Sequence, residues 1–126
     1  MRVIKFRGFN AKNNQWLYGS HIINRGKHFV APDEFAGDKT WEDYEVDPET
    51  IGQFTGLHDK NGKEIYEGDC LLSDENAEVF EVVYDAPRFC FKDNVFGFRF
   101  LNHPEFFQVI GNRYDDPELI EEGGEI

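Results

Sequence analysis

The sequence has little of what marks secreted, membrane-spanning or disulfide-stabilised proteins. It contains two cysteines and one methionine, and no apolar run approaches the ~20 residues that a membrane-spanning helix needs. The first residues are basic but lack the apolar stretch of a secretory signal. Cys70 and Cys90 lie between apolar neighbours, so we expect buried, reduced thiols in a cytoplasmic protein. A disulfide between them is the less favoured alternative.

Familiar catalytic and metal-binding motifs are also missing. The sequence has no nucleophile elbow, no phosphate-binding glycine loop and no His-Glu-x-x-His motif. His21, His28, His58 and His103 lack the close spacing of zinc ligands, and the acidic residues within 59–69 do not follow the EF-hand order. We therefore expect no catalytic residue, no metal and no cofactor. An enzyme with an unrecognised carboxylate site is kept as an alternative.

Charge is distributed very unevenly along the chain. Residues 1–32 hold six basic groups and no acidic group, whereas residues 33–126 hold the other 7 of the 13 basic residues and all 25 acidic ones. The two parts therefore carry +6 and −18, and the net charge is −12. Such a charge repels phosphate backbones, so duplex DNA is an unfavourable partner. We expect the basic segment to lie against acidic residues of this chain or of a second subunit, with a nucleic-acid-associated module as the alternative.

Aromatic residues make up 16% of the chain, with 13 phenylalanines, and favour strands. Alternating apolar and polar residues, broken by turn residues at 10–14, 24–26 and 59–62, predict many short strands. Extended segments are expected at residues 3–9, 15–18, 21–23, 27–31, 50–55, 64–66, 70–72, 78–84, 88–92, 95–101 and 106–110. Helical turns are expected near 33–35 and over 116–120, followed by a frayed acidic tail.

These elements predict a mostly β fold with two parts that share one core. Residues 1–46 form a β-meander and a surface excursion. Residues 47–126 form a small SH3-like barrel, a short helical turn and the tail. The meander is expected to pack on the barrel through Ile4, Phe6 and Trp16. Lys5 and Arg7, on the other face of the strand, are expected to face carboxylates of the barrel or of a second subunit.

One passage is too particular to be generic. Residues 47–69 read Asp-Pro-Glu-Thr-Ile-Gly-Gln-Phe-Thr-Gly-Leu-His-Asp-Lys-Asn-Gly-Lys-Glu-Ile-Tyr-Glu-Gly-Asp and closely resemble the signature of the YopX-like proteins of phages and prophages of low-GC bacteria. Ile4-Lys-Phe-Arg7 with Tyr18-Gly19 resembles that family's opening, and Val109-Ile-Gly-Asn112 with Asp116-Pro-Glu-Leu119 resembles its close. Residues 73–105 carry no such match, and Cys70 stands where an aliphatic residue is common. The resemblance implies a phage-encoded protein, cytoplasmic in its host, with a C-terminal SH3-type barrel and no established activity.

The central passage is expected to be foremost a folding motif. Its glycines at 52, 56, 62 and 68 mark bends or close approaches of the backbone, and its apolar residues Ile51, Phe54, Leu57, Ile65 and Tyr66 are expected in the core. The candidate partner surface consists of polar and basic residues, namely Lys5, Arg7, Gln53, Thr55 and Glu64. The leading hypothesis is a non-enzymatic phage accessory protein that binds another macromolecule, both as a homo-oligomer and with a phage or host protein.

Overall fold

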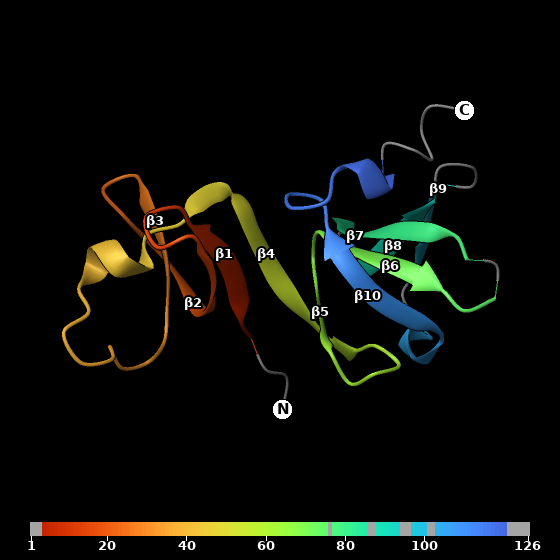
Figure 1. Cartoon of the computed structure of the whole chain (residues 1–126), viewed down its shortest axis with the longest axis horizontal. Helices are drawn as coiled ribbons and strands as arrows, with labels where there is room; N and C mark the ends of the chain where they lie inside the picture. The colour runs from red at the N-terminus through yellow and green to blue at the C-terminus, as the bar shows by residue number, and fades with distance from the viewer. Residues whose placement is uncertain (1–3, 76, 86–87, 94–96, 101–102, 121–126) are drawn as a thin grey trace. The chain divides into compact units, whose positions relative to one another are not determined.

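The computed structural model describes residues 4–75, 77–85, 88–93, 97–100 and 103–120, and confirms a mostly β fold (Figure 1). Its strands are β1 (Phe6–Asn10), β2 (Gln15–Asn24), β3 (Lys27–Ala31), β4 (Asp47–His58), β5 (Glu64–Tyr66), β6 (Asp69–Ser73), β7 (Val79–Asp85), β8 (Arg88–Asp93), β9 (Gly97–Phe100) and β10 (Phe107–Asn112). Two single 3₁₀ turns, η1 (Trp41–Tyr44) and η2 (Pro104–Phe106), interrupt them. Over the described residues, no helix has the length and apolarity needed to cross a membrane.

The strands form two sheets of five strands each. Their orders are β3-β2-β1-β4-β5 and β10-β6-β7-β8-β9, and every pair with a described register is antiparallel. The chain divides into two compact units, residues 1–54 and 55–126. The boundary falls inside β4, whereas the division expected from the sequence, after residue 46, precedes that strand.

In the first unit, the two predicted hairpins are present. Phe6 pairs with Gly19 in the β1–β2 hairpin, and β2 continues into β3 through a two-residue turn at Arg25-Gly26. Both turn residues have positive φ, 52° and 77°, as a type I′ turn requires. The chain later returns along β3, where Phe29 forms a bridge with Glu45.

The expected faces of the first strand need correction at two positions. Ile4 is 69% exposed, whereas Arg7 is only 6% exposed. The Arg7 guanidinium lies 5.0 Å from the centre of the Trp16 ring, which is a cation–π contact. An arginine can bury its aliphatic stem and stack its planar head on a ring. Arg7 is therefore buried and Ile4 is exposed, which is the reverse of what simple alternation predicts.

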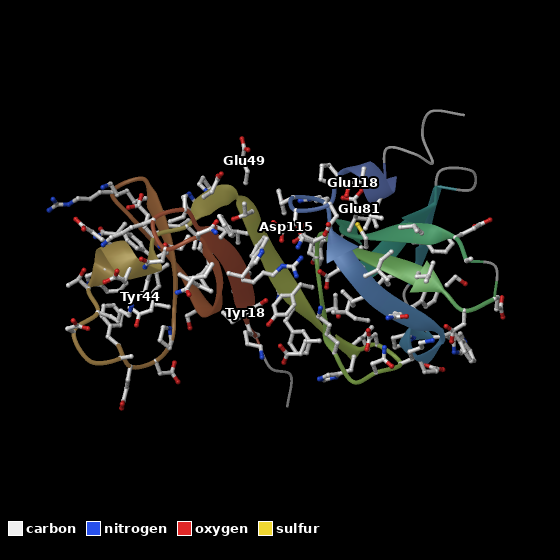
Figure 2. All side chains as sticks on the ribbon, in the orientation of Figure 1. Tyr18, Tyr44, Glu49, Glu81, Asp115 and Glu118 are labelled. Carbon is white, nitrogen blue, oxygen red and sulfur yellow. The ribbon has the colours of Figure 1, made fainter. Side chains whose placement is uncertain are left out.

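The excursion after β3 holds a cluster of aromatic rings. The helical turn expected near residues 33–35 is wrong, because the turn lies at η1, where the Thr40 N–H donates to the Asp43 carboxylate at 3.0 Å. The Phe35 ring lies 4.8 Å from that of Trp41 and 4.5 Å from that of Tyr44, which is labelled in Figure 2. These contacts anchor the excursion without long regular structure.

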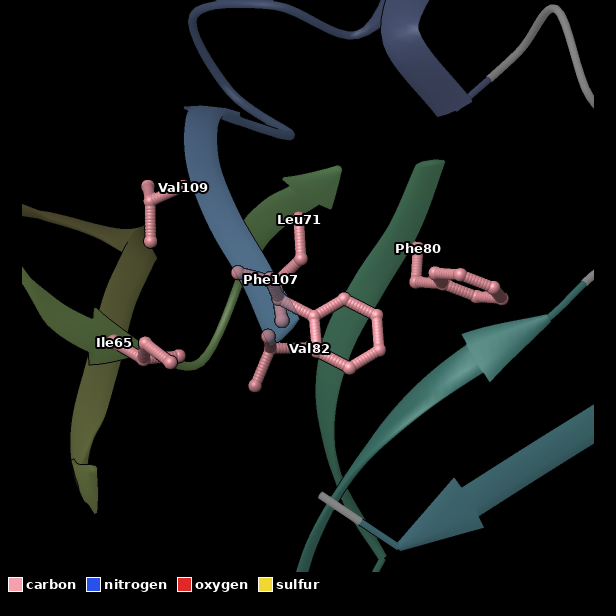
Figure 3. Close-up of a cluster of buried hydrophobic side chains, with 6 residues drawn as sticks. All are labelled: Ile65, Leu71, Phe80, Val82, Phe107 and Val109. Carbon is pink, nitrogen blue, oxygen red and sulfur yellow. The ribbon is translucent and has the colours of Figure 1, made fainter. Parts of the chain in front are cut away.

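The second unit has a compact apolar core. Figure 3 shows its buried members, Ile65, Leu71, Phe80, Val82, Phe107 and Val109, and the partly buried Leu57 packs against them. The rings of Phe80 and Phe107 meet edge to face at 5.8 Å. Beside this core Cys70 is fully buried, as predicted, whereas the Cys90 side chain lies outside the described residues.

The predicted barrel is not closed. Over the described strands, β10 and β9 stand at the two ends of the sheet order, so the second unit has an open antiparallel sheet. The predicted hairpin over β8 and β9 is present, although residues 95, 96 and 101 lie outside the described range. Residues 118–120 form the predicted helical turn, and the tail 121–126 also lies outside the description.

Candidate functional site

The tight turn of the central motif is held by the Asp59 carboxylate. One of its oxygens accepts the N–H groups of Asn61 and Lys63 at 2.8 and 2.9 Å, and the other accepts the N–H of Val109 in β10 at 2.8 Å. Burial alone raises the pKa of this carboxyl, but the three N–H donors outweigh it and hold the pKa below its ordinary value. Asp59 therefore links the motif to the last strand.

Two further polar residues of the motif also serve the fold. The Thr55 hydroxyl donates to the Ile65 carbonyl at 2.8 Å, and the Asp69 carboxylate accepts the Tyr66 N–H at 2.7 Å. Both side chains are buried, with 8% and 1% exposure. This passage is consequently built to bend and pair the backbone, as its glycines and turn residues predicted.

The closing segment follows the same principle. The Asn112 N–H donates to the Asp116 carboxylate at 3.2 Å, and the Asn112 side-chain oxygen accepts the N–H groups of Tyr114 and Asp115 at 3.0 and 2.9 Å. A side chain at position 111 would meet the Asp116 carboxylate and would have to displace it. The residues that resemble the family's close thus tie β10 to the turn after it.

The candidate partner surface is divided by burial. Arg7 and Thr55 are buried, whereas Lys5, Gln53 and Glu64 are partly exposed. In the first unit, the pairing of β1 with β4 brings Lys5 close to Gln53, and the Lys5 ammonium lies 5.1 Å over the Phe54 ring. In the second unit, the Glu64 carboxylate accepts the Tyr66 hydroxyl at 2.9 Å.

An open pocket of about 430 Å³ lies in the first unit beside Asn10. The buried Asn10 amide, missed by sequence reasoning, donates to the carbonyls of Asp43 and Glu45 at 3.2 and 2.7 Å. The pocket is lined by charges of both signs, from Lys12, Lys27, Glu42, Glu45 and Asp47. It has no nucleophile paired with a base, so it carries no recognisable catalytic arrangement.

A pair of histidines lies on the β2–β3 hairpin. His21 Nε2 and His28 Nδ1 are 2.9 Å apart, and the two rings stack at 21° with 5.1 Å between their centres. The register pairs His21 with Val30 and Ile23 with His28, so the two histidines are diagonal neighbours on one face of the sheet. Sequence spacing alone missed this pair, although the turn at residues 24–26 was a signal for it.

Apolar side chains flank the histidine pair. The Phe6 ring meets the His21 ring edge-on at 5.6 Å, and both histidines are partly exposed. Partial burial, followed by the charge of His28, lowers the pKa of His21, so its neutral form is favoured. Ile23 is 61% exposed on the histidine face, and Ile4 precedes Phe6 by two residues. The face combines accessible apolar groups with imidazoles.

The described residues hold no group of three or more His, Cys, Asp or Glu side chains arranged for a metal ion. Three carboxyl groups have a lowered pKa: Thr40 and Asn13 lower that of Asp43 to about 2, and the pKa values of Asp59 and Glu105 are lowered as well. These carboxylates are held ionised, which is the opposite of what a general acid requires.

Comparison with known proteins finds a similar solved structure and a matching family. The chain is similar to protein EF1440 from Enterococcus faecalis, whose crystal structure aligns with a TM-score of 0.61 and 25% identity over 95% of this chain and 99% of that one. No curated protein matches the sequence. The family described as YopX protein matches residues 5–121, nearly the whole chain. The chain belongs to the YopX family.

Proposed function

We propose that this chain is a non-enzymatic accessory protein, encoded by a phage or prophage and acting in the host cytoplasm, that binds macromolecules through its β1–β3 meander. The partners are a second copy of the chain and a phage or host protein. One observation carries the proposal: Ile4 and Ile23 are more than half exposed within a segment that contains no acidic residue. Exposed apolar groups beside charge of one sign are typical of interaction surfaces.

Charge complementarity supports self-association. Residues 1–32 carry +6 and the rest of the chain −18, so a second copy offers an acidic surface to the basic meander. Within the first unit the Lys12 ammonium lies 3.3 Å from the Asp43 carboxylate and 3.6 Å from that of Glu42. Arg25 and Lys27 are exposed next to Ile23 on the β2–β3 hairpin.

The two rival functions receive less support. A nucleic-acid module would need its basic groups on the surface, but Arg7 is buried and Lys12 is paired with carboxylates. A carboxylate enzyme would need a carboxyl with a raised pKa, and the shifts resolved for Asp43, Asp59 and Glu105 are downward.

Sedimentation of the untagged protein across a hundredfold concentration range tests the proposal. We expect the wild type to associate, and the double variant Ile4→Asp/Ile23→Asp to remain monomeric. Ile110→Asp is the matched control, because Ile110 is a 36% exposed isoleucine outside the meander. High salt should weaken the association, since it screens the charges. A wild type that stays monomeric, or a control that dissociates as readily as the double variant, would contradict self-association through the meander.

A further inference from the structure

The geometry points to a chelating site for one late first-row divalent cation, of the Zn²⁺, Ni²⁺ or Cu²⁺ class, at His21 and His28. Neutral imidazole is a preferred ligand of these ions. The site lies within one chain and is independent of whether the chain associates.

The separation of the two nitrogens suits a shared ion. Two imidazole nitrogens about 2.0–2.1 Å from one ion lie about 2.9 Å apart at a right angle and about 3.4 Å apart at the tetrahedral angle. His21 Nε2 and His28 Nδ1 are already 2.9 Å apart. Bringing both ligands to an ion therefore needs rotation of the rings rather than movement of the strands.

The surroundings hold the pair in place while leaving it accessible. Five residue pairs between β2 and β3 and a tight I′ turn fix the register, and the rings of Phe6 and His21 meet edge to face with 5.6 Å between their centres. Both rings are partly exposed, so an ion can reach them from solvent.

The pair supplies two ligands, because no group of three metal-ligating side chains occurs within the described part of the chain. Water completes the coordination sphere, so the affinity should be moderate. A right-angle arrangement of two nitrogens favours Ni²⁺ and Cu²⁺, whose complexes are often square-planar or tetragonal. Ni²⁺ is therefore the better first probe.

Calorimetric titration of the untagged protein with Ni²⁺ at pH 7.5 tests the site. We expect one ion per chain with micromolar affinity, weakened at least tenfold by either His21→Asn or His28→Asn. His103→Asn is the control, since the neighbour of His103 at 3.3 Å is the Glu105 carboxylate and not an imidazole. Circular dichroism should show that each variant stays folded.

A second measurement does not depend on the variants. Diamagnetic Zn²⁺ should shift the imidazole proton resonances of His21 and His28 and leave those of His58 and His103 in place. The proposal is wrong if neither ion binds below millimolar concentration, or if binding is unchanged in both His21→Asn and His28→Asn. In that case the pair is only a hydrogen bond across the hairpin.

Discussion

The carboxylate of Asp59 accepts the backbone N–H of Val109, fifty residues later in the chain, at 2.8 Å. A second hydrogen bond joins the same turn to β10: the Lys60 N–H donates to the Phe107 carbonyl at 3.0 Å. The central family motif thus covers backbone groups of β10, at one end of its sheet. A strand at the end of a sheet has no neighbouring strand on one side, and a buried N–H without an acceptor is costly. Asp59 supplies the missing acceptor for β10.

Replacing Asp59 by Ala should therefore destabilise the protein by about 2–4 kcal/mol, because one buried and two turn N–H groups lose their acceptor. The control is Asp74→Ala, which removes a half-exposed pair with Lys60 at 2.8 Å and should cost about 0–1 kcal/mol. Urea unfolding of both variants measures the difference. Equal losses would show that the link to β10 contributes little.

The same carboxylate predicts a dependence on pH. The pKa of Asp59 is lower in the folded chain than in the unfolded one, where it is about 3.9. Its contribution is therefore fully present above about pH 4 and is lost as the pH falls through the folded pKa. Between pH 6 and pH 3, Asp59→Asn should lose less stability than the wild type. Parallel losses in the two proteins would assign the acid sensitivity to other groups.

Short-range patterns predicted the strands well. Period-two alternation placed the chain segments of β1, β7 and β10, and Asn-Arg-Gly at 24–26 marked the β2–β3 turn. These signals depend on neighbouring residues, and therefore they are readable in the sequence. The linear pattern also carries the resemblance to the YopX family, which the family match over residues 5–121 confirms.

Features that depend on distant contacts were not predictable in the same way. The burial of Arg7 requires the Trp16 ring on the neighbouring strand, and the role of Asp59 requires β10. The histidine pair is an intermediate case, because its diagonal contact follows from the hairpin register once the turn is placed.

The burial of Arg7 and the exposure of Ile4 can be tested directly by substitution. Arg7→Glu should cost several kcal/mol, because it places a carboxylate in a buried site against the Trp16 ring. Ile4→Ala should change stability by less than about 0.5 kcal/mol, since Ile4 is 69% exposed. Thermal unfolding of the two variants compares them. The opposite order would restore the face assignment that alternation alone suggests.

Gly19 of the family-like opening should be far less replaceable than the turn residue Gly26. At Gly19, with φ of +153°, a Cβ atom would meet the Ala31 carbonyl oxygen and force β2 away from β3. At Gly26, with φ of +77°, nothing lies within 4 Å, so Gly26→Ala carries only the backbone cost of about 1 kcal/mol. Gly19→Ala should lower the unfolding midpoint much further. Similar unfolding midpoints for the two variants would mean that β2 and β3 accommodate the added methyl group at position 19 without a loss of stability.

Cys70 should report on the integrity of the second unit. Because its side chain is fully buried, a thiol reagent should modify it slowly in the native protein and rapidly in denaturant. A Cys90→Ser background isolates the signal of Cys70. Rapid native modification in that background would place Cys70 outside the core and weaken the packing described for β6.

The last prediction concerns duplex DNA, for which we expect no general affinity at physiological salt. The basic first quarter carries +6, but Arg7 is buried and Lys12 contacts Asp43 and Glu42 at 3.3 and 3.6 Å. The −18 of the remaining residues opposes any approach of phosphates. Fluorescence anisotropy with a labelled duplex in roughly 0.15 M salt should give no binding at micromolar protein. Micromolar binding that weakens steeply with salt, and that Lys27→Glu abolishes, would instead assign the meander to nucleic acid. Binding that Lys27→Glu leaves intact would place the contact elsewhere, and the meander would keep its proposed protein partner.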